Sequence, residues 1–136
     1  MEIATQLAIF LANQPGALAR VCEALAEAKV NIRAASTSDT VDHTVVRLVV
    51  SDSRKAIFLL EERGMLVVES DVLLLEAPTG PGALARIAER LAKAGVNIDY
   101  LYCSTARKAN RGLLVLRVSD APKALKTLSR RAAARQ

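Results

Sequence analysis

Two stretches of this chain repeat each other, and the repeat limits the folds that the chain can adopt. Residues 15–32 and 81–98 are identical at 13 of 18 positions, starting with the run Pro-Gly-Ala-Leu-Ala-Arg and ending with Val-Asn-Ile. The offset of 66 residues is close to half of the 136-residue chain. We therefore expect two copies of one small fold, over residues 1–70 and 71–136.

Each copy shows the same order of strand and helix patterns. It opens with a short apolar run that is typical of a buried strand, and a Pro-Gly turn leads into apolar residues spaced three and four apart, as in an amphipathic helix. Two further strand patterns and a second helix follow. The strands are expected at 6–11, 30–37, 45–50 and 65–69 in copy one and at 72–77, 96–105 and 113–118 in copy two.

This order predicts two ferredoxin-like βαββαβ modules of the α+β class. Modules of this size bury only about 60% of their unfolded surface, so we expect them side by side in one extended antiparallel sheet, with the helices on one face. Asp52 and Asp120 are expected to cap the second helices. Two extra residues in copy two predict a hairpin loop at 106–110, and residues 129–136 show no strand pattern, so its last strand is expected to be missing or degenerate.

The turn before the first helix has the chemistry of a ligand site. The first backbone N–H groups of a helix have no partner within it, and those of Ala17 and Leu18 are expected to bind a carboxylate. Gly16 permits close approach, Pro15 fixes the turn, and the Asn13 amide offers a donor and an acceptor. A turn that merely caps the helix explains the same residues, so both interpretations stay open.

A strand that ends in this turn, followed by a helix and Val-Asn-Ile and found twice, resembles the ACT domain. The resemblance extends over nearly the whole chain and implies regulatory binding of amino acids at the seam between modules. In copy two Thr79 stands where the pattern has Asn, which makes the first loop the stronger candidate. The ligand residues implied are Asn13, Gln14, Pro15, Gly16, Ala17, Leu18, Asn31 and Ile32 in copy one, and Thr79, Gly80, Pro81, Gly82, Ala83, Leu84, Asn97 and Ile98 in copy two.

An enzyme of the same fold would need a nucleophile with its base, or a set of metal ligands. The single histidine, His43, lies in a predicted turn, where an exposed residue is expected rather than a general base. The first loop has no Cys-x-x-Cys pair, which a metallochaperone would carry there. We therefore expect a protein without catalytic residues, cofactor or metal.

A nucleic-acid-binding protein is also disfavoured. The net charge of +5 comes from the second half of the chain alone, and only 3% of the residues are aromatic, although RNA-binding modules of this fold stack bases on aromatic side chains. Tyr100 and Tyr102 are expected to line the seam or a pocket instead. An interaction module without a ligand remains an alternative, because degenerate loops would look similar.

The surroundings of the protein follow from its apolar segments. No apolar run approaches the roughly 20 residues that span a bilayer, and the N-terminal residues lack the basic start of a signal peptide, so we expect a cytoplasmic protein without membrane contact.

The apolar strands at 45–50 and 113–118 leave apolar side chains on both faces of the sheet. We expect a homodimer that covers the open face, and possible association with a metabolic enzyme.

Overall fold

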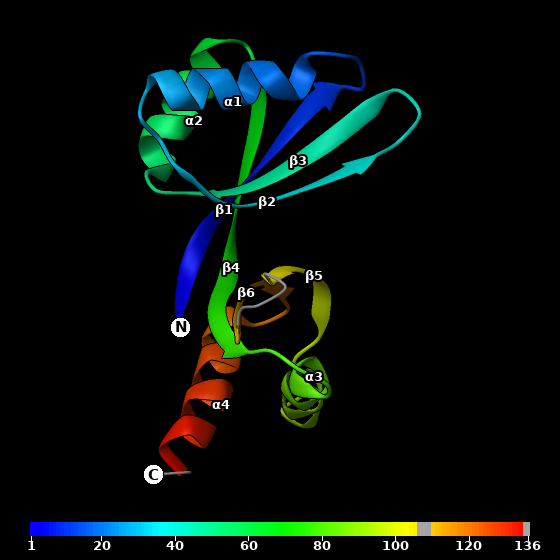
Figure 1. Ribbon diagram of the computed structural model, residues 1–136, viewed down its shortest axis with the longest axis vertical. Coiled ribbons are helices and arrows are strands. Elements are labelled where there is room, and N and C mark those ends of the chain that lie inside the picture. The colour runs from blue at the N-terminus through cyan, green and yellow to red at the C-terminus, as the bar shows by residue number, and fades with distance from the viewer. Residues whose placement is uncertain (106–109, 135–136) are drawn as a thin grey trace. The chain divides into compact units, whose positions relative to one another are not determined.

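The computed structural model describes residues 1–105 and 110–134 (Figure 1). The hairpin loop expected at 106–110 lies outside them except for Asn110. The described residues form strands and helices in the order that the repeat predicts. The elements are β1 (Glu2–Ala12), α1 (Ala17–Glu27), β2 (Ile32–Asp39), β3 (His43–Val50), α2 (Ser53–Glu62), β4 (Leu66–Pro78), α3 (Ala83–Lys93), β5 (Ile98–Thr105), β6 (Arg111–Val118) and α4 (Ala121–Ala134).

The strands join one six-stranded sheet in the order β2-β3-β1-β4-β6-β5. Antiparallel pairing links β3 to β1 and β2, and it links β6 to β4 and β5. The same irregularity in register occurs in β2 between Ile32 and Ala34 and in β5 between Ile98 and Tyr100. The copies thus share a β-bulge as well as their sequence pattern, and the predicted α+β fold of two ferredoxin-like modules is confirmed.

Residues Thr5–Ser70 form one compact unit. Its strands turn alternate residues toward α1 and α2, so that Leu7 and Ile9 of β1 and Leu48 of β3 lie in one core with both helices (Figure 1). Inside the unit the Gln6 Nε2 amide donates to Ser70 Oγ at 3.3 Å, which links β1 to β4. The core is formed by Leu7, Ile9, Leu11, Ala17, Val21, Leu25, Val30, Val46, Leu48, Val50, Ala56 and Leu60.

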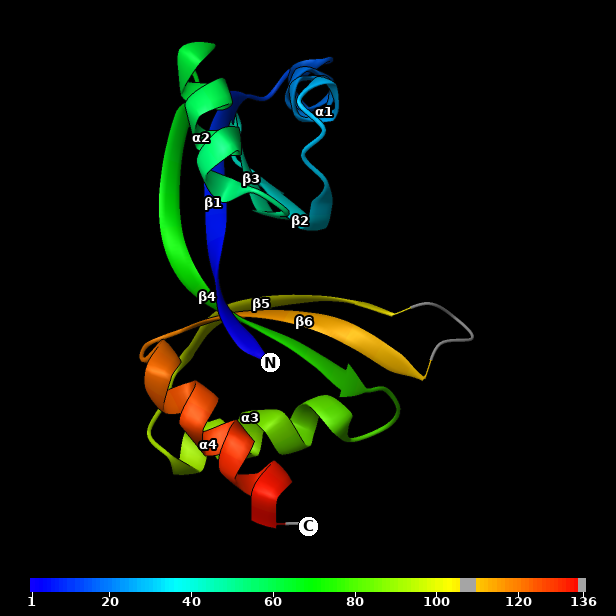
Figure 2. The same cartoon turned by 90° about the vertical axis from the view of Figure 1, so that its left-hand side faces the viewer.

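The second unit consists of Met1–Ala4 and Asp71–Gln136. Its helices α3 and α4 cover one face of β4, β6 and β5, as Figure 2 shows. Leu91 of α3 and Leu116 of β6 are fully buried in its core. They correspond to Leu25 of α1 and Leu48 of β3 in the core of the first unit. The core is formed by Leu73, Leu75, Ala77, Leu91, Val96, Leu114, Leu116, Val118, Ala121, Ala124 and Leu128.

Two long strands belong to both units. Strand β4 runs without a break from Leu66 to Pro78, because no Gly or Pro interrupts it before its last residue, whereas the sequence predicts two strands separated near residue 70. The N-terminal end of β1, which neighbours β4 in the sheet, joins the second unit. The division expected between residues 70 and 71 therefore differs from the structure in the placement of Met1–Ala4.

The last strand of the second unit thus comes from the other end of the chain. The chain that follows β6 continues as helix α4 to Ala134, in agreement with the strong helix propensity of the alanines and arginines there. The sequence predicts that the last strand is missing, and the structure shows that Glu2–Ala4 of β1 occupies a place beside β4 instead.

The aspartates expected at the starts of α2 and α4 accept hydrogen bonds from the helix backbone. Asp52 Oδ1 accepts from the Lys55 N–H at 3.1 Å, and Asp120 Oδ1 accepts from the Lys123 N–H at 3.0 Å. Both capping predictions are confirmed. Each carboxylate satisfies one of the four N–H groups that a helix leaves without an internal partner.

We expect Asp52→Ala to lower the free energy of unfolding by about 1 kcal/mol, and Asp120→Ala by a similar amount, because alanine cannot accept the backbone hydrogen bond. Urea unfolding followed by circular dichroism measures the change. Asp52→Ser and Asp120→Ser are the matched controls, since serine also caps helices and should recover most of the loss. An alanine variant that unfolds at the wild-type midpoint would show that the cap contributes nothing.

Candidate ligand-binding site

The turn between β1 and α1 is fastened to the β2–β3 hairpin through Asn13. The backbone N–H of Asn13 donates to the Asp42 carbonyl at 3.0 Å, and its side-chain Nδ2 donates to the Thr40 carbonyl at 3.3 Å. The side-chain donor that we expected to contact a ligand is therefore engaged within the protein. This arrangement supports a structural role for Asn13 and leaves its Oδ1 oxygen for a ligand.

The free backbone donors at the start of α1 differ from the expected pair, which was the N–H groups of Ala17 and Leu18. Gly16 precedes the helix in the left-handed conformation, with φ of 87°, and the Ala17 N–H donates to the Gln14 carbonyl at 3.3 Å. Ala17 therefore uses its donor inside the turn. The first-turn amides that the helix geometry leaves without a carbonyl are then those of Leu18 and Ala19.

The turn between β4 and α3 repeats this backbone arrangement. Thr79 N–H donates to the Asn110 carbonyl at 3.1 Å, as Asn13 does to Asp42, and Ala83 N–H donates to the Gly80 carbonyl at 3.2 Å. Gly82 has φ of 83° and Gly80 has φ of 123°. The replacement of Asn by Thr79 thus changes a side chain and leaves the backbone of the loop intact.

The structure separates each loop from the Asn-Ile pair of its own copy. Asn31 and Ile32 follow the far end of α1, and a helix of 11 residues is about 16 Å long. The Asn31 N–H donates to Ser51 Oγ at 2.9 Å, and its carbonyl accepts from the Ser51 N–H at 2.9 Å. The Asn31 backbone therefore pairs with Ser51.

Copy two repeats this separation. Asn97 exchanges the same two hydrogen bonds with Ser119, at 3.0 and 2.9 Å, and its side-chain Nδ2 donates to Asp99 Oδ1 at 2.8 Å. Ile98, like Ile32, is half-buried against the core of its unit. Within a unit these residues serve strand pairing and packing, and they do not meet the loop.

A cavity of about 190 Å³ borders the second loop. Four of the expected ligand residues, Thr79, Gly80, Ala83 and Leu84, form one side of it. Sequence reasoning favoured the first loop, whose residues line neither this cavity nor the next one. The residues that it missed come from four elements of the fold, β4, α3, β5 and β6, and carry no local signal; they are Ala77, Pro78, Ile87, Cys103 and Leu114.

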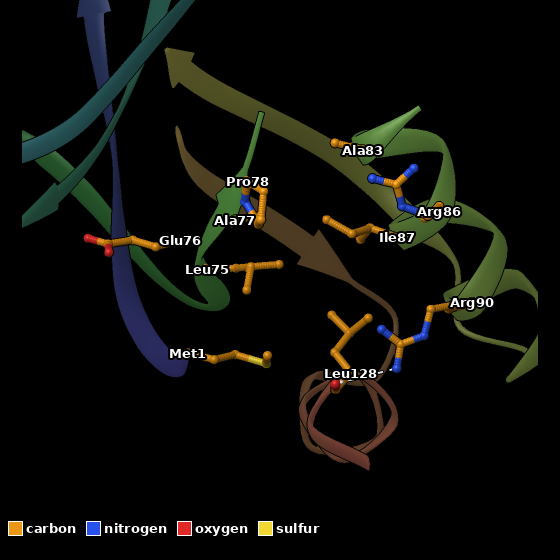
Figure 3. A pocket seen from close by; sticks show the side chains of 10 residues that line it. All are labelled: Met1, Leu75, Glu76, Ala77, Pro78, Ala83, Arg86, Ile87, Arg90 and Leu128. Atoms are coloured by element: carbon orange, nitrogen blue, oxygen red, sulfur yellow. Dashed lines mark hydrogen bonds between the residues drawn. The ribbon is translucent and has the colours of Figure 1, made fainter. Parts of the chain in front are cut away.

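A second cavity of about 220 Å³ lies beside the first, between β4, α3 and α4 (Figure 3). Its walls are mainly apolar, and two arginines of α3, Arg86 and Arg90, reach it. The two cavities share Ala77, Pro78, Ala83 and Ile87. Both are smaller than the roughly 300 to 1,000 Å³ of pockets for drug-sized ligands, so each suits a small metabolite.

The model of the ACT domain pair family matches residues 1–132 of this chain. The chain belongs to the ACT domain pair family. Its relatives typically act as regulatory, ligand-binding modules. The predicted resemblance is therefore confirmed, and it extends over almost the whole chain.

Solved structures have a fold similar to that of this ACT domain pair. Protein BT0572 from Bacteroides thetaiotaomicron is 34% identical, with a TM-score of 0.89 over 96% of this chain and 89% of that one. The ligand-free regulatory subunit of aspartate kinase from Thermus thermophilus is 19% identical, with a TM-score of 0.72 over 96% and 97% of the two chains. At that identity the second likeness shows the fold alone. A comparison with curated proteins found no match.

Three other residues that the sequence raised as candidates, His43, Tyr100 and Tyr102, lie at the start of β3 and in β5. His43 is exposed at the start of β3, where its N–H donates to Thr40 Oγ1 at 3.3 Å in the hairpin turn. Tyr100 and Tyr102 are half-buried in β5. Within residues 1–105 and 110–134, no three His, Cys, Asp or Glu side chains gather as metal ligands would. No helix in that part of the chain is long and apolar enough to cross a membrane.

Proposed function

We propose that this ACT domain pair is a non-catalytic regulatory protein of the cytoplasm that binds a free amino acid at its second loop. The observation that carries the proposal is the cavity of about 190 Å³ whose wall includes Thr79, Gly80 and Leu84. A pocket formed by a loop that begins a helix combines space for a ligand with backbone donors for its carboxylate.

The cavity offers different chemistry at its two ends. At the start of α3 the first-turn amides of Leu84 and Ala85 correspond to those of Leu18 and Ala19, and they suit a carboxylate. The Thr79 hydroxyl and the loop carbonyls provide oxygen acceptors for an ammonium group. The opposite wall, with Ala77, Ile87 and Leu114, is apolar and suits a small aliphatic side chain.

The experiment is a thermal-shift screen with each of the twenty amino acids, followed by calorimetric titration of any that stabilises the protein. A ligand present at 100 times its dissociation constant, and bound by the folded state alone, adds about 2.7 kcal/mol of stability. We expect small aliphatic amino acids to give the largest shift in melting temperature. If none of the twenty raises the melting temperature, the protein is better explained as an interaction module without an amino-acid ligand.

We also propose that two copies of the chain associate and that the pair regulates a metabolic enzyme. Within Thr5–Ser70, the face of the sheet away from α1 and α2 exposes Phe10, Leu66 and Val68, which are 40%, 63% and 48% exposed. Their neighbours along each strand belong to or pack against the helix-covered core, so alternation places these three on the open face. Exposed apolar side chains gathered on one face are typical of an interface.

We expect Val68→Glu to convert a dimer into a monomer, because a charge buried without a partner in an apolar interface is unfavourable. Sedimentation velocity at tens of micromolar measures the state, since weak interfaces still form at such concentrations. Phe58→Glu is the control, because Phe58 is 71% exposed on α2 and away from the sheet face. A wild-type monomer, or equal dissociation in both variants, would contradict this interface.

A further inference from the structure

We propose that the cavity between β4, α3 and α4 is a second ligand site, which binds a small aliphatic carboxylate without an amino group. This site goes beyond the proposed amino-acid site, from which it differs in its charged residues and in the elements that form it. The ligand class is inferred from three features of the described residues that line the cavity: an apolar wall, two guanidinium groups, and an acidic side chain, Glu76, that is directed away from them.

The apolar wall is formed by residues that are distant in sequence. Leu75 of β4 and Leu128 of α4 are 7% and 3% exposed, and Figure 3 shows both side chains directed into the cavity. Ile87 borders it from α3, and the Met1 side chain closes it from the N-terminal end of β1. Such a wall favours the alkyl chain of a ligand, because each methylene group buried there is removed from water.

The two arginines lie one helical turn apart on the side of α3 that borders the cavity. An anion in the cavity would accept hydrogen bonds from the guanidinium groups, whose planar geometry suits a carboxylate.

The fold positions both guanidinium groups. Arg90 is half-buried, and its Nη2 donates to the Thr127 carbonyl at 2.7 Å and to the Leu128 carbonyl at 3.4 Å. Arg86 is exposed and its Nη1 lies over Gly82, where a Cβ atom would come within 3.2 Å of it. Gly82 therefore leaves room for the arginine in addition to allowing the left-handed turn.

The chemistry of the lining argues against an amino acid here. Glu76 is the one acidic residue among those that border the cavity, and Figure 3 shows its carboxylate directed away from Arg86 and Arg90. The carbonyls of Thr127 and Leu128 already accept hydrogen bonds from Arg90. The ammonium group of an amino acid would thus lie beside two cations, whereas a carboxylate on an alkyl chain meets a complementary surface.

The test is a titration of the full-length protein, labelled at its methyl groups, with butyrate, hexanoate and octanoate, followed by NMR. We expect saturable shifts of the Leu75 and Leu128 methyl signals, because these two residues border this cavity and not the one at the second loop. Hexanol and norleucine are the matched probes, since the first lacks the carboxylate and the second adds an ammonium group to hexanoate. Both are expected to bind at least about tenfold more weakly, which is the effect of one lost charge-assisted hydrogen bond.

Arg86→Gln should weaken hexanoate binding by about tenfold or more. Arg20→Gln is the matched control, because Arg20 has the same place in the first copy, lies over Gly16 in the same way, and borders neither cavity. It should leave hexanoate binding unchanged. Both residues are exposed, so neither variant is expected to unfold.

Several results would overturn the proposal. No methyl shifts with any of the three carboxylates would mean that the cavity is not a site, and equal binding of hexanol would remove the role of the arginines. Equal binding of norleucine would reassign the cavity to zwitterions. Equal loss in Arg20→Gln and Arg86→Gln would indicate attraction by net charge alone. The Leu84→Asp variant separates these results from the amino-acid screen because, of the two cavities, Leu84 borders only the one at the Thr79 loop.

Discussion

Leu84→Asp is expected to weaken amino-acid binding by more than about tenfold without lowering the melting temperature. Leu84 is 41% exposed in the first turn of α3 and borders the smaller cavity. An aspartate there places a negative charge beside the amides that would bind the ligand carboxylate, and the two anions repel. The same charge interacts favourably with the N-terminus of a helix, so the fold is not expected to weaken.

Leu18→Asp is the matched control for this prediction. Leu18 is 44% exposed at the equivalent place of α1, and it borders neither cavity. Calorimetric titration of both variants with the stabilising amino acid distinguishes the two loops. Loss of binding in Leu18→Asp with normal binding in Leu84→Asp would place the ligand at the first loop, as the sequence suggests, and would refute the site proposed at Thr79.

Leu25→Ala and Leu91→Ala are each expected to lower the free energy of unfolding by about 2 to 5 kcal/mol. The two leucines occupy equivalent places on α1 and α3, and both are fully buried in the cores of their units. Removing a buried isobutyl group loses the burial of its apolar surface and leaves a cavity in a packed core. Urea unfolding measures the loss, with exposed Leu18→Ala as the control.

Both variants are also expected to unfold in one transition. Strands β1 and β4 each contribute residues to both units, so a unit cannot lose its strands without disturbing the other. Circular dichroism and hydrogen exchange at Leu48 and Leu116 should therefore report the same midpoint. Two separate transitions, in which one unit unfolds while the other keeps its protected amides, would contradict this coupling.

The backbone conformation of Gly16 limits the residues that can replace it. From the sequence, a β-branched residue at this position would be expected to block the ligand with a smaller cost in stability. The left-handed φ of 87° disfavours any residue with a Cβ atom, and most of all a β-branched one, so such a variant would also strain the turn. Leu18 and Leu84 avoid this difficulty because they lie in ordinary helical turns.

Local interactions account for the helices, caps and turns that can be predicted from the sequence alone. Helix periodicity, the capping aspartates Asp52 and Asp120, and the Pro-Gly turns depend on residues a few positions apart. The repeat shows that the same local patterns occur in both halves of the chain. Their βαββαβ order limits the topology to a ferredoxin-like one. These features predict the fold of each module without knowledge of any long-range contact.

Tertiary structure decided where the two cavities described above lie. Arg20 and Arg86 lie in identical runs of six residues, and so do Leu18 and Leu84, yet Arg86 and Leu84 border these two cavities and Arg20 and Leu18 do not. The lining of these two cavities comes from distant parts of the chain. Cys103 and Leu114 form the far wall of one cavity, and Met1 and Leu128 help to enclose the other.

The N-terminal strand shows the same dependence on distant residues. No local pattern reveals that Met1–Ala4 joins Asp71–Gln136, because the pairing of β1 with β4 links segments more than sixty residues apart. The sequence therefore determined the elements and their repetition, since these follow from neighbours along the chain. The closure of the second unit and the position of its cavities depend on contacts between residues that only the folded chain brings together.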